Sequence, residues 1–515
     1  MRGYTGKILF VDLGSGLIEE KQIPDQIYED YLAGVGLGAY ILYREIPEGA
    51  DPLGPENVLA FMSGLLTGTG SMLTGRWMVV CKSPLTGGWG DANCGGNFSP
   101  AIKQCGYDGI FFKGIAQKPV YLVIDGENSA RLEDASDVWG LDSVEAEKLL
   151  EKKHRGRKTP AVAVIGTSGE KLSLISGICN DRGRIAARSG CGAVMGSKKL
   201  KAVVLNGDEK ISCADRETVR AFSKEFTSKV RKVSLPRFLT GSVLPLAGML
   251  MGKLKKVVPL DGMAVLVPTL KKWGTPMSNS LGVTSGDLPI KNWNGSVVNF
   301  KYSRYKHLNP DLIISREYKK YSCYSCVVGC GGLCKIGDIA GGEFAETHKP
   351  EYETCAAFGG LLLNSDRESI FYINELLNRA GMDSISAGNT VAYALECYEQ
   401  GLLTKDDTGG LELRWGNADT IVALVKKMIA REGVGDLLAD GVKKAVGRIG
   451  ERSAPFAMHA GGQEPGMHDP RFDPLLGVHF SADPTPGRHT IGCGQYYQMM
   501  HLWEEVSWAP PVTNH

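Results

Sequence analysis

The stretch Lys7-Ile8-Leu9-Phe10-Val11-Asp12-Leu13, followed by Gly14-Ser15-Gly16, joins an apolar run to a glycine-rich turn. Short runs of this kind, rich in β-branched and aromatic residues, predict β-strands. The pattern recurs at residues 77–81, 109–114, 119–124, 161–166 and 200–205. Residues 143–153 have helical spacing instead, and Ser143 is a candidate N-cap. These patterns predict a β-rich domain over residues 1–210.

Beyond residue 210 the apolar residues recur with the spacing of helices. The segments with this spacing are residues 216–230, 367–380, 390–400, 418–431 and 435–446. We therefore expect an α+β protein, with the N-terminal β-rich domain followed by two mainly α-helical domains over residues 211–415 and 416–515. A chain of 515 residues is long enough for several domains with separate cores.

The overall composition excludes several classes of partner. Lys and Arg number 58 and Asp and Glu 57, so no charge bias predicts binding to nucleic acid or to an anionic membrane. No run of about 18 apolar residues predicts a membrane span. The N-terminus lacks the apolar run of a secretory signal, and the 13 cysteines are not spaced as a disulfide framework. We expect a cytoplasmic protein whose thiols are reduced or bind metal.

The sharpest motif is a cysteine array with the spacing C-x2-C-x3-C. Cys323, Cys326 and Cys330 form this array, and Cys334 follows four residues later. Three thiolates at this spacing can hold a [4Fe–4S] cluster, with Cys334 or a distant cysteine as the fourth ligand. A structural zinc site would need a second C-x2-C pair, which the sequence lacks. Inert buried thiols are the other alternative.

Several glycine- and arginine-bearing segments could hold an anionic or heterocyclic group. Gly95 and Gly96 are adjacent between two asparagines, a pattern typical of a backbone nest. Arginines are able to grip phosphate with two hydrogen bonds. Asp383 comes just before a predicted helix, where amides and a carboxylate can bind a ligand. The candidate residues are Arg76, Asn93, Gly95, Gly96, Arg182, Gly183, Arg184 and Asp383.

Taken in order, these segments resemble the aldehyde:ferredoxin oxidoreductase family over nearly the whole chain. The resemblance rests on residues 32–39, 51–57, 64–69, 82–88, 106–110, 187–197, 381–386 and 433–438. It implies a tungsten (or molybdenum) bis-molybdopterin cofactor, Mg²⁺ bridging the pterin phosphates, and a [4Fe–4S] cluster. It also implies ferredoxin or an electron-transfer subunit as partner, a small-molecule substrate, and a homodimer or hetero-oligomer.

The resemblance also implies roles for individual residues. Arg76 would lie between the cluster and a pterin, and Asp383 would hold a pterin ring. Asn93, the Gly95–Gly96 pair and residues 182–184 would contact the cofactor. In aldehyde oxidation, His489 could donate a hydrogen bond to the carbonyl. Glu351 or Glu353 could accept the proton, a step that typically contributes about 10²–10⁴-fold.

Two features depart from the family pattern. Cys355 follows the segment of Glu351 and Glu353, and a thiolate there could ligate the metal, as in the tungsten subunit of benzoyl-CoA reductases of the same family. The family's C-terminal Gly-x-Cys motif does not occur before His515. We therefore expect a truncated last domain, or Cys334 or Cys493 as the fourth cluster ligand. The alternatives to aldehyde oxidation are an aromatic acyl-CoA (benzoyl-CoA) reductase subunit and a non-catalytic electron-transfer subunit.

Overall fold

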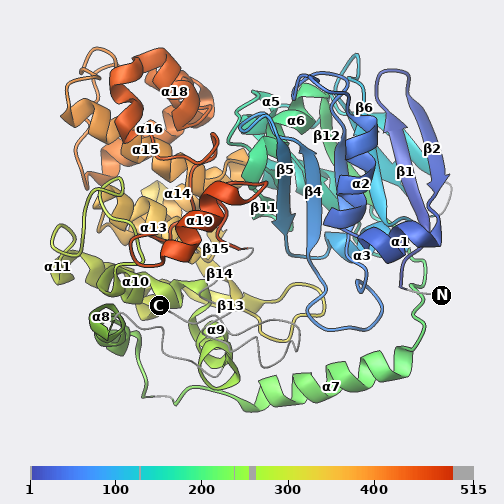
Figure 1. The fold of residues 1–515 in the computed structure, drawn as a ribbon, viewed down its shortest axis with the longest axis horizontal. Coiled ribbons are helices and arrows are strands. Elements are labelled where there is room, and N and C mark those ends of the chain that lie inside the picture. The colour runs from blue at the N-terminus through green and yellow to red at the C-terminus, as the bar shows by residue number, and fades with distance from the viewer. Residues whose placement is uncertain (1–2, 127–128, 237, 255–261, 491–515) are drawn as a thin grey trace.

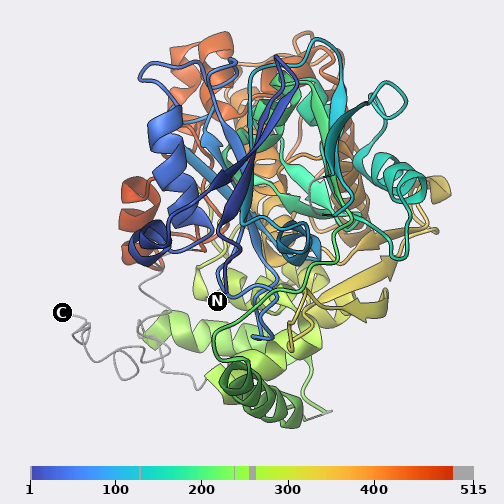
Figure 2. The ribbon, with the colours of Figure 1, turned by 90° about the vertical axis from the view of Figure 1, so that its right-hand side faces the viewer.

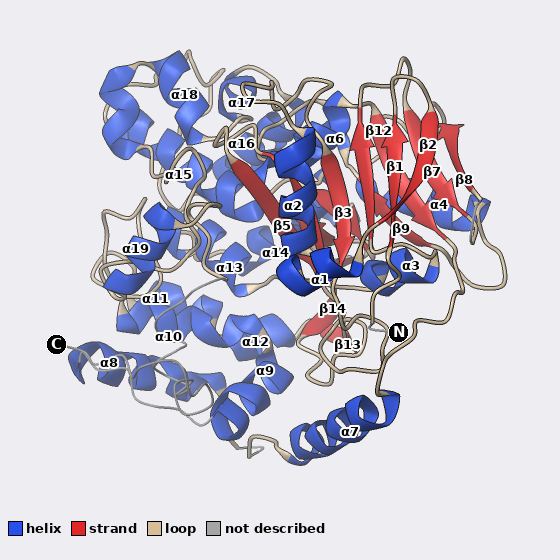
Figure 3. Ribbon diagram, turned by 45° about the vertical axis from the view of Figure 1, so that its right-hand side comes forward, coloured by secondary structure: helices blue, strands red, loops and turns tan. Residues whose placement is uncertain are grey.

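The computed structural model describes residues 3–126, 129–236, 238–254 and 262–490. Two six-stranded sheets lie on one side of the molecule and most of the helices on the other (Figure 1, Figure 3). Within the described residues, no helix is both long enough and apolar enough to cross a membrane. Cys493, one of the candidate cluster ligands, lies outside the described residues.

The two sheets are mixed. In the first, the spatial order is β2 (Leu17–Gln22), β1 (Lys7–Asp12), β6 (Gly109–Lys113), β3 (Leu59–Ser63), β4 (Trp77–Lys82) and β5 (Trp89–Cys94). In the second, it is β11 (Arg184–Ala186), β10 (Ile178–Asn180), β9 (Ala161–Val164), β12 (Leu200–Leu205), β7 (Val120–Ile124) and β8 (Ala130–Asp134). The β1–β6 and β7–β12 pairs are parallel and the other pairs antiparallel.

Alternation along β1 shows why the sheets are covered on both faces. Leu9 and Val11 belong to the core between the two sheets, whereas Ile8 and Phe10 belong to a second core on the outer face of the first sheet. Successive side chains of a strand point to opposite faces, so a continuous apolar run predicts a strand that is buried on both sides. The uninterrupted apolar run at residues 8–11 therefore specifies a central layer.

Six helices accompany the sheets. Their bounds are α1 (Asp25–Tyr31), α2 (Val35–Glu45), α3 (Phe98–Gln104), α4 (Ser143–Lys153), α5 (Thr167–Glu170) and α6 (Cys191–Ser197). α1 and α2 cover the outer face of the first sheet, α4 covers that of the second, and α3 and α6 contribute to the core between the sheets. Figure 2 shows this layering, from the blue helices on one side to the cyan α4 on the other.

The rest of the described chain is mainly helical. Its helices are α7 (Arg216–Lys232), α8 (Leu244–Leu254), α9 (Val267–Trp273), α10 (Ser278–Ser285), α11 (Tyr302–Tyr305), α12 (Pro310–Ile314), α13 (Tyr352–Phe358), α14 (Arg367–Ala380), α15 (Ser384–Glu399), α16 (Ala418–Ala430), α17 (Val434–Leu438), α18 (Val442–Ile449) and α19 (Pro474–Ala482). One large core joins α13–α18. The predicted α+β class is confirmed, whereas the domain boundaries near 210 and 415 stay predictions.

The structure differs from the predicted elements in three places. α4 is capped by Asp142, which accepts a hydrogen bond from the Glu145 amide, and not by Ser143. The helix predicted over residues 435–446 is two helices, α17 and α18, because the chain turns at Gly441 with a φ of 82°. A three-stranded sheet, β13 (Glu317–Tyr321), β14 (Gly331–Lys335) and β15 (Glu346–His348), occurs within the region predicted to be helical.

Candidate active site

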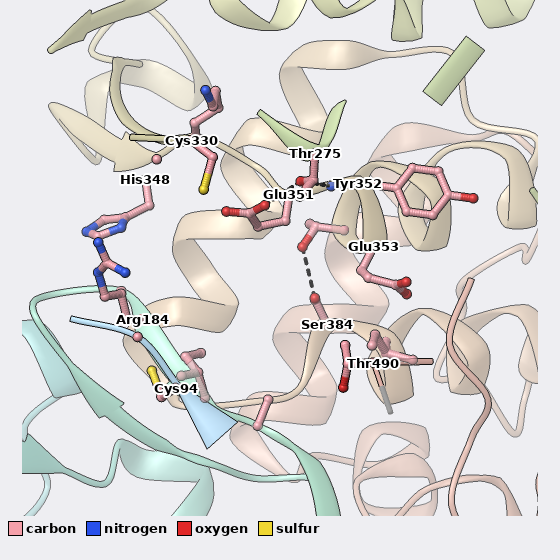
Figure 4. Close-up of a pocket in the computed structure, with 18 of the residues that line it drawn as sticks. Cys94, Arg184, Thr275, Cys330, His348, Glu351, Tyr352, Glu353, Ser384 and Thr490 are labelled. Carbon is pink, nitrogen blue, oxygen red and sulfur yellow. Dashed lines mark hydrogen bonds between the residues drawn. The ribbon is translucent and has the colours of Figure 1, made fainter. Parts of the chain in front are cut away.

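A cavity of about 770 Å³ lies between the ends of β5 and β11, the β13–β14 turn, and helices α13 and α15. Figure 4 shows Cys330, Arg184 and His348 at one end of it and Glu353 and Thr490 at the other. Most of the residues selected from the sequence line this cavity. They are Arg76, Asn93, Gly95, Gly183, Arg184, Cys323, Cys326, Cys330, Glu351, Glu353, Asp383 and His489.

The three cysteines of the C-x2-C-x3-C array are brought together by the turn between β13 and β14. Ser325 and Gly329 adopt left-handed φ values of 52° and 65°, and the Cys326 amide donates to the Cys323 carbonyl at 3.0 Å. All three cysteines are partly exposed. Burial raises the pKa of Cys330 to about 11, with neighbouring acids and thiols adding to the effect. A metal cluster would offset this, because thiolates are its ligands.

Arg184 is the cation that this thiol end contacts. Its Nη1 donates to the Cys323 Sγ at 2.8 Å, and its guanidinium lies 4.6 Å from the centre of the Tyr321 ring. Gly95 lies against the same pair, since a Cβ there would come within 2.5 Å of the Cys323 Sγ and 2.8 Å of the Arg184 Nη1. The backbone directly after β5 therefore approaches the cysteine turn so closely that a side chain at this position would have to displace Cys323 or Arg184.

Further arginines reach the cavity from the sheets, each beside an oxygen acceptor. Arg76 donates through Nε to the Asn93 Oδ1 at 2.6 Å. Arg188 donates to the Asp383 carboxylate at 2.7 Å, and Asp383 also caps α15 by accepting from the Ile385 amide. The sheet-containing part of the chain therefore supplies Arg76 and Arg188, while the acidic cap Asp383 comes from the helical part.

Arg488 and Asn378 carry buried polar atoms that have no hydrogen-bond partner among the described residues. Arg488 contacts Asp91, but its Nη2 is buried without a hydrogen-bond partner among the described residues, as is the Asn378 Nδ2. Burial and the nearby Arg76 lower the pKa of Arg488 to about 10. Buried donors of this kind cost free energy unless a ligand accepts from them. The donor set therefore fits a polar, anionic group such as a phosphate-bearing cofactor.

The other end of the cavity holds a carboxylate between two imidazoles. The Glu353 Oε1 lies 3.2 Å from the His489 Nε2 and 3.5 Å from the His468 Nε2. The Nδ1 of His468 faces Asp287 at 2.9 Å. Asp287, His468, Glu353 and His489 thus form a continuous line of titratable groups.

The charges along this line differ. Burial raises the pKa of Glu353, although His468 and the Met467 amide oppose it. Burial alone would lower the pKa of His468, but Asp287 and Glu353 outweigh it and raise the pKa to about 9. Burial and the nearby cations hold the pKa of His489 well below its usual value. At neutral pH His468 is therefore protonated and His489 is neutral.

Glu353, His468 and His489 also have the spacing of a small metal site. One ligand atom from each lies within 4.8 Å of the others. A metal at this point would have to displace the proton of His468, which Asp287 and Glu353 stabilise. The arrangement is therefore better suited to moving a proton than to holding an ion.

Glu351, the other predicted acid, lies between the two ends of the cavity (Figure 4). It precedes α13 as its N-cap residue, and it accepts a hydrogen bond from the Thr275 hydroxyl. Thr275 in turn accepts from the Tyr352 amide at 2.9 Å. The Thr275 hydroxyl holds Glu351 in place, and Figure 4 shows Glu351 on the Cys330 side of Glu353.

Four of the selected residues do not line the cavity. Arg182 turns away, and its Nη2 pairs with the Glu151 carboxylate at 2.8 Å. Gly96 lies behind Gly95, packed against Asn180 and Asp181. Cys334 and Cys355 are fully buried in the helical core, where burial raises the pKa of each to about 12. In the described part of the chain, neither thiol lines the cavity with Cys323, Cys326 and Cys330.

Three functional candidates were not selected from the sequence, namely His468, Asp287 and His348. The only local signal for His468 is its place between two prolines, at residues 465–470. Asp287 lies 181 residues earlier in the chain, so its contact with His468 is visible only in the folded protein. His348 packs at the thiol end, where its Nδ1 lies 2.6 Å from the Tyr321 hydroxyl.

A cluster-type cysteine turn, an arginine-lined cavity and a Glu–His pair together define a cofactor-dependent oxidoreductase. The comparisons with known proteins give the family. The aldehyde ferredoxin oxidoreductase N-terminal domain matches residues 8–207, and domains 2 and 3 of the same family match residues 258–507. The chain belongs to the aldehyde ferredoxin oxidoreductase family and is an oxidoreductase, which confirms the resemblance predicted from its motifs.

Individual relatives show how far the similarity extends. A tungsten-containing aldehyde ferredoxin oxidoreductase of Pyrococcus horikoshii is 35% identical over 95% of this chain and 74% of its own length. The WOR-like subunit of an aliphatic sulfonate oxidoreductase of Pyrococcus furiosus is 30% identical over 95% of this chain and 75% of its own. A solved structure, the active site complex BamBC of benzoyl coenzyme A reductase with 1,5-dienoyl-CoA, superposes with a TM-score of 0.75 at 26% identity, and covers 91% of this chain and 66% of that one.

Proposed function

We propose that this protein oxidises aldehydes to carboxylic acids with a tungsten (or molybdenum) bis-molybdopterin cofactor and passes the electrons through a [4Fe–4S] cluster to ferredoxin. The observation that carries the proposal is that one cavity is lined both by Cys323, Cys326 and Cys330 and by the Glu353–His489 pair. An oxidation that also releases protons needs a path for the electrons and an acceptor for the protons. The relatives named as tungsten-containing aldehyde oxidoreductases support this assignment.

The cavity residues suit the proposed cofactor by charge. Arg188 and Arg488 would bind its phosphates, Arg76 would lie between the cluster and a pterin, and Asp383 would accept from a pterin ring. Gly95 leaves room for the backbone to approach the cysteine turn. Bound there, the cofactor would supply the two-electron chemistry and the cluster the single-electron relay.

The chain's own contribution to the reaction is proton handling. His489 is neutral, so it can donate one hydrogen bond to a substrate carbonyl without carrying charge. Burial raises the pKa of Glu353, and its carboxylate lies 3.2 Å from the His489 Nε2, where it can accept a proton. Protonated His468 lies between the carboxylates of Asp287 and Glu353 and so orients Glu353. Glu351 is the second candidate base, on the side of the cysteines.

A second candidate is the tungsten subunit of an aromatic acyl-CoA reductase, because the BamBC complex shares the fold. In that alternative, the Cys355 thiolate is a ligand of the metal. The Cys355 thiol lies in the core of α13, 4.0 Å from the Pro350 carbonyl, and is absent from the residues that line the cavity. This placement favours the aldehyde oxidoreductase. Membership in a family of oxidoreductases speaks against the non-catalytic alternative.

The test is metal analysis and substrate screening on protein produced without oxygen and with tungstate. We expect tungsten or molybdenum with pterin, about four iron atoms per chain, and reduction of a viologen dye by short or aromatic aldehydes. Protein that contained iron but neither pterin nor a heavy metal would overturn the proposal. Benzoyl-CoA turnover without aldehyde turnover would select the second candidate.

A further inference from the structure

Helix α7 presents an exposed cationic surface at the edge of the molecule (Figure 1, Figure 3). Its 17 residues include six cations and two acids, in a chain whose formal net charge is only +1. The cations, all exposed, are Arg216, Arg220, Lys224, Lys229, Arg231 and Lys232. Phe222 is exposed on the same helix, with 62% of its surface accessible. A large aromatic side chain within a charged surface is typical of a protein interface.

The other face of the helix contacts the protein. Ser223 and Val230 are buried there, and Val219, Phe226 and Thr227 are partly buried. The Asp215 carboxylate caps the N-terminus by accepting from the Thr218 amide, and the Lys271 ammonium donates to the Val230 carbonyl at the C-terminus. The cationic surface is therefore preorganised, which lowers the entropy lost on binding.

A single segment of chain separates α7 from the cysteine turn. The Met72 amide donates to the Ser223 hydroxyl of α7 at 3.2 Å, and the next amide, that of Leu73, donates to the Ser325 carbonyl at 2.8 Å. Ser325 lies between Cys323 and Cys326. Lys319 and Lys320 of β13, the strand that enters the turn, are also exposed. The cationic surface therefore borders the thiol end of the cavity and not the Glu353 end.

We propose that the outer face of α7, with β13, is the docking surface for a small acidic one-electron carrier protein. The inference rests on the proposed function, since it assigns the partner of the same cluster to one face. Opposite charge speeds and orients encounter, with gains of about 10–10³ in association rate. Docking here brings the carrier next to the partly exposed cysteines and leaves the substrate end of the cavity free.

The other occupants of a cationic helix fit less well. A helix that lies on a membrane needs a free apolar face, but here that face packs against the protein and Phe222 is the only large exposed apolar side chain on α7. A second copy of the chain would place cations against cations in a symmetric contact. An acidic protein is the occupant that the charge selects.

The experiment reverses the charge of two side chains of α7, in the double variant Arg220→Glu/Lys224→Glu. The matched control is Lys148→Glu/Lys152→Glu, because these exposed lysines have the same i,i+4 spacing on α4 and lie beyond the sheets. Each variant is assayed as full-length holoenzyme, with a viologen dye and with an acidic ferredoxin as probe. The ferredoxin assay is run at low salt and at about 0.5 M salt, where charges are screened beyond a few ångströms.

We expect the KM for ferredoxin at low salt to rise about tenfold in the α7 variant and less than about threefold in the control. High salt should remove the difference, and dye turnover should match wild type in both. Equal KM values for the two variants would overturn the docking surface. Sedimentation of the wild type, but not the α7 variant, with phosphatidylglycerol vesicles and an unchanged ferredoxin KM would assign the helix to lipid. Wild-type protein without dye activity would refute the proposed function instead.

Discussion

At one end of the cavity three thiols, Arg184 and the Tyr321–His348 pair lie together, whereas the other end holds Asp287, His468, Glu353 and His489. Burial and Arg184 lower the pKa of His348 to about 4, so the thiol end has few protons to exchange near neutrality. The carboxylate end holds groups whose pKa values are shifted in opposite directions by their neighbours.

Under the proposed function, electrons and protons would therefore leave the cavity on opposite sides. Groups with divergent pKa values are typical of acid–base sites, whereas a cluster site needs thiolates and a fixed cation.

The largest effect is expected for the cysteine turn. Cys326→Ser should remove most of the iron and reduce turnover to background with either acceptor, because a [4Fe–4S] cluster needs its thiolate ligands. Iron analysis and electron paramagnetic resonance give the measurement. The control is Cys397→Ser, a buried cysteine in α15 away from the cavity, which should keep its iron. Full iron content in Cys326→Ser would show that the cluster does not bind at this end of the cavity.

The next effect concerns the proton acceptor. Glu353→Gln should lower kcat with a dye acceptor by about 10²–10⁴-fold while the iron content stays unchanged, because the amide cannot accept a proton. Glu351→Gln is the matched comparison, since it removes the same charge from the cysteine side of the cavity. A larger loss in Glu351→Gln than in Glu353→Gln would move the base towards the thiol end.

A smaller effect is expected on stability as a function of pH. The pKa of His468 is raised to about 9 in the folded protein, so the stability it contributes is fully present below its unfolded value near 6.5 and is lost as pH rises through about 9. Asp287→Asn should therefore lower the unfolding free energy by about 1–2 kcal/mol near pH 6. Denaturant titrations should show the deficit shrinking towards pH 9.5. A deficit that is the same at every pH would mean that Asp287 does not stabilise the protonated imidazole.

The smallest effect is expected for Cys355. Cys355→Ala should leave the tungsten and iron contents unchanged and lower the unfolding free energy by about 1 kcal/mol, because a small buried side chain is lost from a packed core. Metal analysis and chemical unfolding give the two readouts. Loss of tungsten without loss of stability would place this thiol at the metal and favour the acyl-CoA reductase.

Local pattern in the sequence was enough to predict much of this architecture. The strand at residues 7–12 and the helices α7, α14 and α16 agree with their predicted ranges closely, because strand and helix periodicity depends on residues that are near in sequence. The cysteine turn was identified for the same reason, since Cys323, Cys326 and Cys330 lie within eight residues. The three-stranded sheet that carries the turn was missed, because its strands are short and β13 has charged residues on its exposed face.

The sequence by itself determined the fold class and the cysteine turn, and most of the residues selected from it line the cavity. Only the tertiary structure decided which of them face one another. Asp287 and His468 meet across 181 residues, and Arg188 reaches Asp383 across 195. It also decided that Cys355 turns into the core while Glu353, two residues earlier, turns into the cavity. Successive positions of a helix point about 100° apart, so which one meets the ligand depends on what packs against the other.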